Sequence, residues 1–316
     1  MSNLNIMRIK RNNFYLVLVY IIFLSVLFLT KNQKLFTEFF QGDLLIYSNH
    51  YKNNSIPSYY GLTLYMSFKL FNSWLAFSYF LLIYLIVFYT TIFVCSLKLF
   101  DPSSNVKYIL FAIILASYPF YTGYAAFVLK QGLGMIFMLI HIFYVKKQFS
   151  ILSILIMLLA IFSHYIFILF FIIFYYSKFF NLRVLIFLML FSIFIYIFNF
   201  KLFSYQNLAL YLENNFNFIG EDILINTFEG VKIKFAIYSL LPLLALQVKQ
   251  FKNTINENII LNKIIKFHFL YSALIYIFFS DYYYLDRFLS LTWILYPFYL
   301  IPFFNKVFFK KKILTN

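Results

Sequence analysis

The sequence predicts an all-α fold: a polytopic integral membrane helix bundle with about ten transmembrane helices, a short interfacial helix and both termini cytoplasmic. Three observations predict it. Of the 316 residues, 64% are hydrophobic and only 11% are charged, which is more apolar surface than one soluble core of this size can bury. Several apolar runs approach or exceed the roughly 18 residues that a spanning helix needs. The 26 basic residues lie mostly between these runs, as expected for cytoplasmic loops.

The first elements are one span, one loop and one short helix. The apolar run 14–30 follows three basic residues but lacks a small-residue cleavage site, so we expect a retained helix. Residues 31–58 are polar and form the first outer loop. At about 1.5 Å per residue, the run 59–71 is too short to cross comfortably, and we predict a tilted or interfacial helix there. A full span follows over residues 74–97.

The remaining spans are separated by polar turns. Residues 108–121 and 125–144 form a predicted hairpin, because turn formers connect them at 121–124. Later spans are expected at 185–199, 235–247, 264–280 and 288–304. The chain is therefore predicted to be a single transmembrane domain, residues 1–316, with outer loops at about 31–58, 200–234 and 281–287.

The run 151–176 is interrupted near its middle by Ser163 and His164. It forms either one long tilted helix or two short helices that meet at the outer surface. Lys178 and Arg183 favour two helices, because a hairpin returns both basic residues to the cytoplasm and places His164 outside.

Several functional classes are excluded. Cys95 is the only cysteine, so neither an intrachain disulfide nor a Cys/His metal site is expected. The net charge is +16, yet no basic stripe alternates with exposed aromatics, and we predict no nucleic-acid partner. No nucleotide-binding, serine-hydrolase or zinc-protease motif is present. We therefore expect no cofactor and no metal.

Acidic residues gather on the predicted outer face. Eight of the ten fall in outer segments, and because carboxylates carry little topological information, their accumulation suggests a function. They are Glu38, Asp43, Glu213, Glu221, Asp222, Glu229, Asp281 and Asp286. Among them, Glu221, Asp222 and Asp43 are candidates for a base that deprotonates an acceptor hydroxyl, or are simply solvated loop charges.

Two polar positions interrupt apolar helices. Lys130 lies about one and a half turns inside a predicted helix, where it either binds a ligand or extends its side chain to the lipid headgroups. Gln131 and two glycines follow it, and glycines allow close approach to a backbone. His164 is either a packed aromatic side chain or a general acid and base, because imidazole titrates near neutral pH.

The segment 280–288 combines tyrosines, carboxylates and an arginine. It forms either an interfacial aromatic belt or a site for a sugar and a phosphate, since tyrosines stack on sugars and arginine binds phosphate through two parallel hydrogen bonds. The candidate substrate-binding residues are Tyr282, Tyr283, Tyr284, Asp286 and Arg287.

Five motifs occur in order along most of the chain: Asp43 and Tyr47 ahead of Tyr59 and Tyr60, VLKQGLGM at 128–135, SHYIFIL at 163–169, KFAIYSLLPL at 234–243 and DRFLSLTWILYPFYLIP at 286–302. Together they resemble the EpsG and O-antigen polymerase (Wzy) group of bacterial polysaccharide polymerases. Lys130 stands where that group typically has arginine, and lysine keeps the charge but lacks the planar fork.

This resemblance implies a glycosyltransferase-type enzyme of the bacterial inner (plasma) membrane. It would join repeat units carried on undecaprenyl pyrophosphate, extending the O-antigen of lipopolysaccharide, a capsule or an exopolysaccharide. Arg287, Lys130 and Gln131 would bind the lipid-linked oligosaccharide, and His164 or one of the acidic residues Glu221, Asp222 and Asp43 would activate the acceptor hydroxyl. Membrane lipid is an implied partner, and a chain-length regulator protein is a further candidate.

Two other classes remain open. An integral glycosyltransferase with a lipid-phosphate sugar donor would use Asp43 as its base. A flippase for lipid-linked glycans would need charges along a path through the membrane, and the scarcity of such charges makes transport the weakest alternative.

Overall fold

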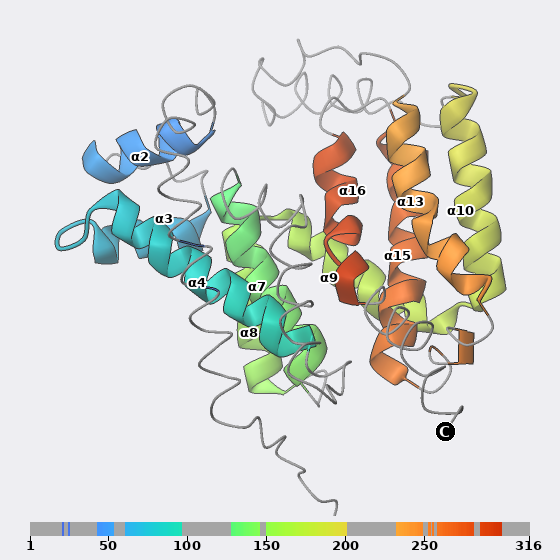
Figure 1. Ribbon diagram of the computed structural model, residues 1–316, viewed down its shortest axis with the longest axis horizontal. Helices are drawn as coiled ribbons and strands as arrows, with labels where there is room; N and C mark the ends of the chain where they lie inside the picture. Colours follow the sequence, from blue (N-terminus) through green and yellow to red (C-terminus); the bar gives the residue numbers. More distant parts are fainter. Residues whose placement is uncertain are drawn as a thin grey trace, which may run out of the picture. The chain divides into compact units, whose positions relative to one another are not determined.

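A computed structural model defines the fold. It describes residues 43–53, 61–96, 128–145, 150–200, 232–248, 258–280 and 285–298, with a few single positions elsewhere. Every regular element in these segments is a helix (Figure 1), which confirms the all-α prediction for this part of the chain. The chain divides into two compact units, residues 1–168 and residues 169–316.

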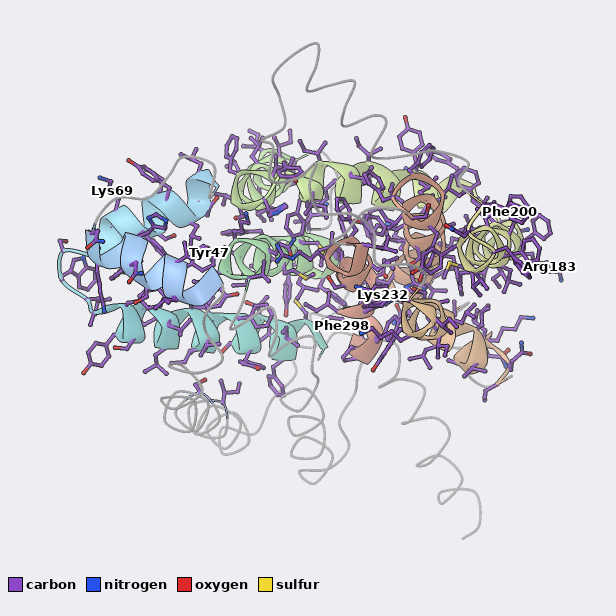
Figure 2. All side chains as sticks on the ribbon, turned by 90° about the horizontal axis from the view of Figure 1, so that it is seen from above. Tyr47, Lys69, Arg183, Phe200, Lys232 and Phe298 are labelled. Atoms are coloured by element: carbon purple, nitrogen blue, oxygen red, sulfur yellow. The ribbon has the colours of Figure 1, made fainter. Side chains whose placement is uncertain are left out.

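Five complete helices lie in the described part of the first unit. They are α2 (Asp43–Asn53), α3 (Leu62–Phe71), α4 (Phe77–Ser96), α7 (Leu129–Tyr144) and α8 (Ile151–Ser163). Helix α3 is as short as the sequence predicts, and Lys69 near its end is exposed (Figure 2).

Helix α2 lies within the expected outer loop 31–58, so part of that segment is helical. The reason is a pair of aromatic side chains one turn apart. Tyr47 and Tyr51 are both buried, and their rings meet the ring of Phe68 in α3 edge to face, with centroids 6.4 and 5.0 Å away. The Tyr51 hydroxyl also donates to the carbonyl of Leu75 at 2.9 Å. These contacts fix α2 against the turn between α3 and α4.

Helices α7 and α8 form an antiparallel pair, because a short connection joins them and they pack along their length. Near the connection, Ser153 Oγ of α8 lies 3.5 Å from His141 Nδ1 of α7. Helix α4 also packs on α7, where the Tyr144 hydroxyl donates to the carbonyl of Val94 at 3.1 Å.

The interruption predicted at Ser163 and His164 is confirmed. Ser150 caps the start of α8 by accepting from the backbone N–H of Ser153. The helix ends at Ser163, and His164 adopts an extended backbone conformation. A new helix, α9 (Ile166–Tyr176), begins two residues later. The hairpin that would return α9 to the cytoplasmic side remains a prediction.

The second unit is built around one long helix. Its elements after α9 are η2 (Ser177–Phe179), α10 (Leu182–Ile197), α13 (Ile233–Leu246), α15 (Ile259–Phe278) and α16 (Leu285–Trp293). Helices α10, α13 and α15 stand side by side (Figure 1), and α15 packs against α10 and α16. Most of α15 is buried, and its Phe267 contacts Phe170 of α9 with ring centroids 4.3 Å apart.

Two helices in the described segments are long and apolar enough to cross a membrane. They are residues Phe77–Cys95, within α4, and Ile259–Phe278, which form α15. Six other apolar helices in these segments have 10–17 residues, fewer than the roughly 20 that a bilayer core requires of an upright helix. The predicted total of about ten spans therefore remains a prediction.

Candidate functional site

The pairing of α7 with α8 brings two of the predicted motifs to one end of the first unit. The contact between His141 and Ser153 sets the register. Gln131 precedes His141 by ten residues, and Ser163 follows Ser153 by ten, so in an antiparallel pair both lie about 15 Å further along. Gln131 is therefore level with Ser163, and His164 is the next residue.

The beginning of α3 lies at this same end. Gly61, directly before α3, has a φ of 91°, a conformation that residues with a side chain rarely adopt. A Cβ atom there would lie 3.0 Å from the carbonyl oxygen of Phe162 and closer still to that of Ser163. Thr63 Oγ1 also donates to the carbonyl of Leu159 at 3.1 Å. Only glycine allows α3 to approach the end of α8 this closely.

A second glycine brings α7 against the beginning of α9. Gly134 is one turn after Gln131 on the same face of α7, and its Cα lies directly against the buried ring of Phe167. Phe167 in turn follows His164 by three residues. The contact between Gly134 and Phe167 is therefore three residues from Gln131 on one side and three residues from His164 on the other.

The hydrogen bonds of His164 determine which ring nitrogen carries the proton. The backbone N–H of Ile166 donates to His164 Nδ1 at 3.2 Å, so Nδ1 is unprotonated and Nε2 carries the hydrogen of the neutral ring. The half-exposed ring stacks on Tyr165, with centroids 4.7 Å apart. In this tautomer His164 presents a hydrogen-bond donor rather than a base.

Gln131 is a buried amide with an unused acceptor. Its side chain is only 3% exposed, and Oε1 has no hydrogen-bond partner among the residues that the structure describes. Such a group costs about 1–3 kcal/mol when it stays unsatisfied. The neighbouring Lys130 is half-buried in the first turn of α7.

Arg287 lies in the first turn of α16, in the second unit. Its side chain is half-exposed, and its carbonyl accepts from Ser290 Oγ at 2.7 Å. The next residue, Phe288, stacks on Phe279 at the end of α15, with centroids 4.9 Å apart. The arginine therefore lies where α15 ends and α16 begins.

Two lysines lie at the same end of the second unit. The backbone N–H of Lys232, labelled in Figure 2, donates to the Tyr196 hydroxyl at 2.8 Å, and the Tyr196 ring lies 4.9 Å from that of Tyr276 near the end of α15. Lys234 follows in the first turn of α13. Cations from α13 and α16 thus share one end of the unit.

Beneath this end lies a buried polar network that sequence reasoning missed. Ser239 Oγ of α13 lies 3.0 Å from the Tyr276 hydroxyl and accepts from Trp293 Nε1 at 3.1 Å. The Ser239 carbonyl accepts from His268 Nε2 at 2.9 Å. Three helices, α13, α15 and α16, are therefore joined at one serine.

Proline explains why α13 accepts bonds from its neighbours. Pro242 lies inside the helix and has no N–H, so the carbonyl of Tyr238, four residues earlier, loses its helical partner. The hydroxyl of Tyr296, just beyond α16, donates to that carbonyl instead. A proline in an apolar helix was the available sequence signal, since the freed carbonyl requires a donor from outside the helix.

Several predicted site residues cannot be placed. Glu221, Asp222, Tyr282, Tyr283 and Tyr284 lie outside the described residues. Asp43 begins α2 and Asp286 lies in α16, but their side chains also lie outside what the structure describes. Within the described residues, no group of three or more His, Cys, Asp or Glu side chains is placed to hold a metal ion.

No protein-family model, curated protein or solved structure matches the chain.

Proposed function

We propose that the chain is a multi-pass protein of the bacterial inner membrane that polymerises polysaccharide repeat units. Its substrate would be an oligosaccharide on undecaprenyl pyrophosphate, and its product a longer lipid-linked glycan. The proposal includes the topology predicted from the sequence, with about ten spans and both termini cytoplasmic.

Exposed apolar faces support a membrane location. On α10, Phe187, Phe191 and Phe194 recur at intervals of three and four residues and are 71%, 48% and 52% exposed. On α8, Leu152 and Leu155 are 63% and 52% exposed. Stripes of this kind are unfavourable in water and favourable against lipid. Together with the two helices of spanning length, they fit a bilayer environment.

The observation that carries the proposal is the level placement of Gln131 and His164. The sequence separates them by 33 positions, yet they lie at the same end of an apolar helix pair. They belong to the two motifs that resemble polymerase motifs, VLKQGLGM and SHYIFIL. A polar group gathered at the end of apolar helices is where a substrate anchored in lipid would present its headgroup and sugars.

The reaction is a glycosyl transfer. The bond between the glycan anomeric carbon and the pyrophosphate oxygen breaks, and a bond forms between that carbon and the hydroxyl oxygen of the acceptor unit. Undecaprenyl pyrophosphate leaves with the bonding electron pair, and Arg287 would stabilise its charge. The hydroxyl proton passes to a base, for which the acidic candidates Glu221, Asp222 and Asp43 are better suited than the donor tautomer of His164.

Replacing Arg287 with alanine tests the proposal. In a strain lacking the gene, we expect surface polysaccharide with a single repeat unit, and the wild-type gene should restore the ladder of chain lengths. Arg287→Ala should restore no ladder, because losing a donor to a developing anion typically costs about 100- to 1,000-fold in rate. Polyacrylamide gels of surface polysaccharide report the ladder, and immunoblots of membranes report protein level.

Arg183→Ala is the matched control. Arg183 is exposed in the first turn of α10 (Figure 2), so its loss should leave the ladder intact. A full ladder from Arg287→Ala would refute the role of Arg287. A deletion strain that retains long chains would refute the polymerase, and truncation within one repeat unit would indicate a glycosyltransferase that adds one sugar.

A further inference from the structure

We propose that the end of the first unit at Gln131 and His164 is a carbohydrate subsite that binds a hydroxyl group of the repeat unit. This inference rests on the proposed polymerase function and deepens it. It assigns sugar recognition to α7 and the α8–α9 break, with Gln131 Oε1 as the hydrogen-bond acceptor.

Burying Gln131 without a hydrogen bond to its side-chain oxygen costs free energy. Its neighbours on α7, Leu129 and Met135, are fully buried apolar residues, and an apolar side chain of similar volume would fit the same surroundings without an unsatisfied oxygen. An amide whose acceptor stays unused therefore adds nothing to the stability of the fold. A ligand that donates a hydrogen bond to Oε1 would remove the cost.

Because Gln131 Oε1 is a hydrogen-bond acceptor, its ligand has to be a hydrogen-bond donor. A carbonyl-type oxygen accepts hydrogen bonds and cannot donate them. Pyrophosphate at neutral pH offers mainly acceptor oxygens, so it is a poor partner for Oε1. A sugar hydroxyl carries one hydrogen to donate and lone pairs that accept. Gln131 Oε1 matches its donor function.

The backbone around the subsite keeps these groups in place. Gly134 and Phe167 hold α7 against the start of α9, and Gly61 holds α3 against the end of α8. Both contacts leave no room for a Cβ atom. The position of Gln131 relative to the helix break is therefore set by packing and is already formed before a ligand binds, which lowers the entropic cost of binding.

Gln131→Met tests the subsite, because methionine has a similar shape but no acceptor oxygen. The probes are the repeat-unit oligosaccharide, released by mild acid from the lipid carrier of the deletion strain, and inorganic pyrophosphate. Affinities come from the shift in unfolding temperature of the purified full-length protein in detergent. We expect Gln131→Met to bind the oligosaccharide about tenfold more weakly, the effect of one hydrogen bond, and pyrophosphate equally well.

Met138→Leu is the control, since Met138 is fully buried two turns along the same helix and leucine conserves its volume. It should match the wild type with both probes. The unfolding temperature of ligand-free Gln131→Met should equal or exceed that of the wild type, so that weaker binding is not a folding defect.

Three results would overturn the subsite: equal oligosaccharide affinity in wild type and Gln131→Met, no oligosaccharide binding by the wild type, or a loss confined to pyrophosphate. None of them affects the gel assay of the deletion strain. A normal ladder in that strain would instead remove the polymerase function itself, so the two failures are distinguishable.

Discussion

Replacing Gly134 with alanine should destabilise the first unit, although alanine is the better helix former. Gly134 lies inside α7, against the fully buried ring of Phe167. A Cβ atom at this position would lie 2.7 Å from Cδ2 and 2.8 Å from Cζ of that ring, and closer still to Cε2. These distances are shorter than van der Waals contact, so either α7 or the ring has to move.

The expected magnitude follows from two opposing terms. Inserting a methyl group into a packed core costs about 1–3 kcal/mol, and the short distances to three ring atoms favour the upper value. The higher helix propensity of alanine offsets about 1 kcal/mol of this. We therefore expect Gly134→Ala to lower the free energy of unfolding by about 2 kcal/mol.

Without the Phe167 ring, Gly134→Ala should stabilise the protein instead of destabilising it. Valine has no atom beyond Cγ, so Phe167→Val eliminates all three ring contacts. In that background only the propensity term remains, and Gly134→Ala should raise the free energy of unfolding by about 1 kcal/mol. The coupling between the two positions is then about 3 kcal/mol, at the upper end for residues in contact.

Thermal unfolding of the four purified proteins in detergent measures this cycle. For a chain of this size, 1 kcal/mol corresponds to roughly 2 °C. The wild-type background should thus show a fall of about 4 °C and the Phe167→Val background a rise of about 2 °C. An equal shift in both backgrounds would show that the ring does not limit the space at Gly134.

Three predictions concern the second unit. Ser239→Ala should lower the free energy of unfolding by about 2–4 kcal/mol, because the buried Trp293 N–H and the Tyr276 hydroxyl both lose a hydrogen-bond partner. Asn258→Ala should lower it by about 1 kcal/mol, since Asn258 caps α15 through the N–H of residue 261. Asn262→Leu should be neutral or stabilising, because the buried Oδ1 of Asn262 has no hydrogen-bond partner within the described part of the chain. Thermal unfolding in detergent measures all three.

Ser192→Ala is the control for Ser239→Ala. Ser192 is equally buried, but its hydroxyl donates only to the carbonyl of Met189 within α10, so its loss leaves no buried donor unpaired. Equal effects of the two serine substitutions would show that the network around Ser239 contributes no stability. An unchanged unfolding temperature in Asn258→Ala would show that the cap is not needed to begin α15.

Hydropathy located most of the helices because burial depends mainly on runs of apolar residues. The span expected at 74–97 is α4, and the break expected in 151–176 separates α8 from α9. The predicted ends of helices were less accurate where contacts with other helices determine the first residue. Helix α16 begins at Leu285, three residues before the expected span, because Leu285 is already packed and only 2% exposed.

The sequence singled out Lys130, Gln131 and His164 as polar positions in apolar runs. It could not give the register that places Gln131 level with Ser163, because that register depends on the contact between His141 and Ser153. The assignment of these polar positions to the outer face remains a prediction. The protonated nitrogen of His164 could not be derived from sequence, because it depends on the backbone N–H of Ile166.

The importance of Ser239 was hidden for a general reason. Serines are common in apolar helices and usually bond to a carbonyl of their own helix, as Ser163 does with Leu159. A pattern of residue types does not distinguish them from a serine that joins three helices. The distinction arises from the crossing of α13, α15 and α16, which is a property of the assembled unit.

Pro242 and Tyr296 should not evolve independently, because both determine which donor the carbonyl of Tyr238 has. Pro242 removes its helical donor, and Tyr296 supplies another from beyond α16. Losing the tyrosine first would remove the donor that replaces the helical one, whereas losing the proline first would restore a helical N–H and make the tyrosine hydroxyl dispensable. Substitutions at these two sites should therefore accumulate in one preferred order, and descendants with alanine at 242 would be free to carry phenylalanine at 296.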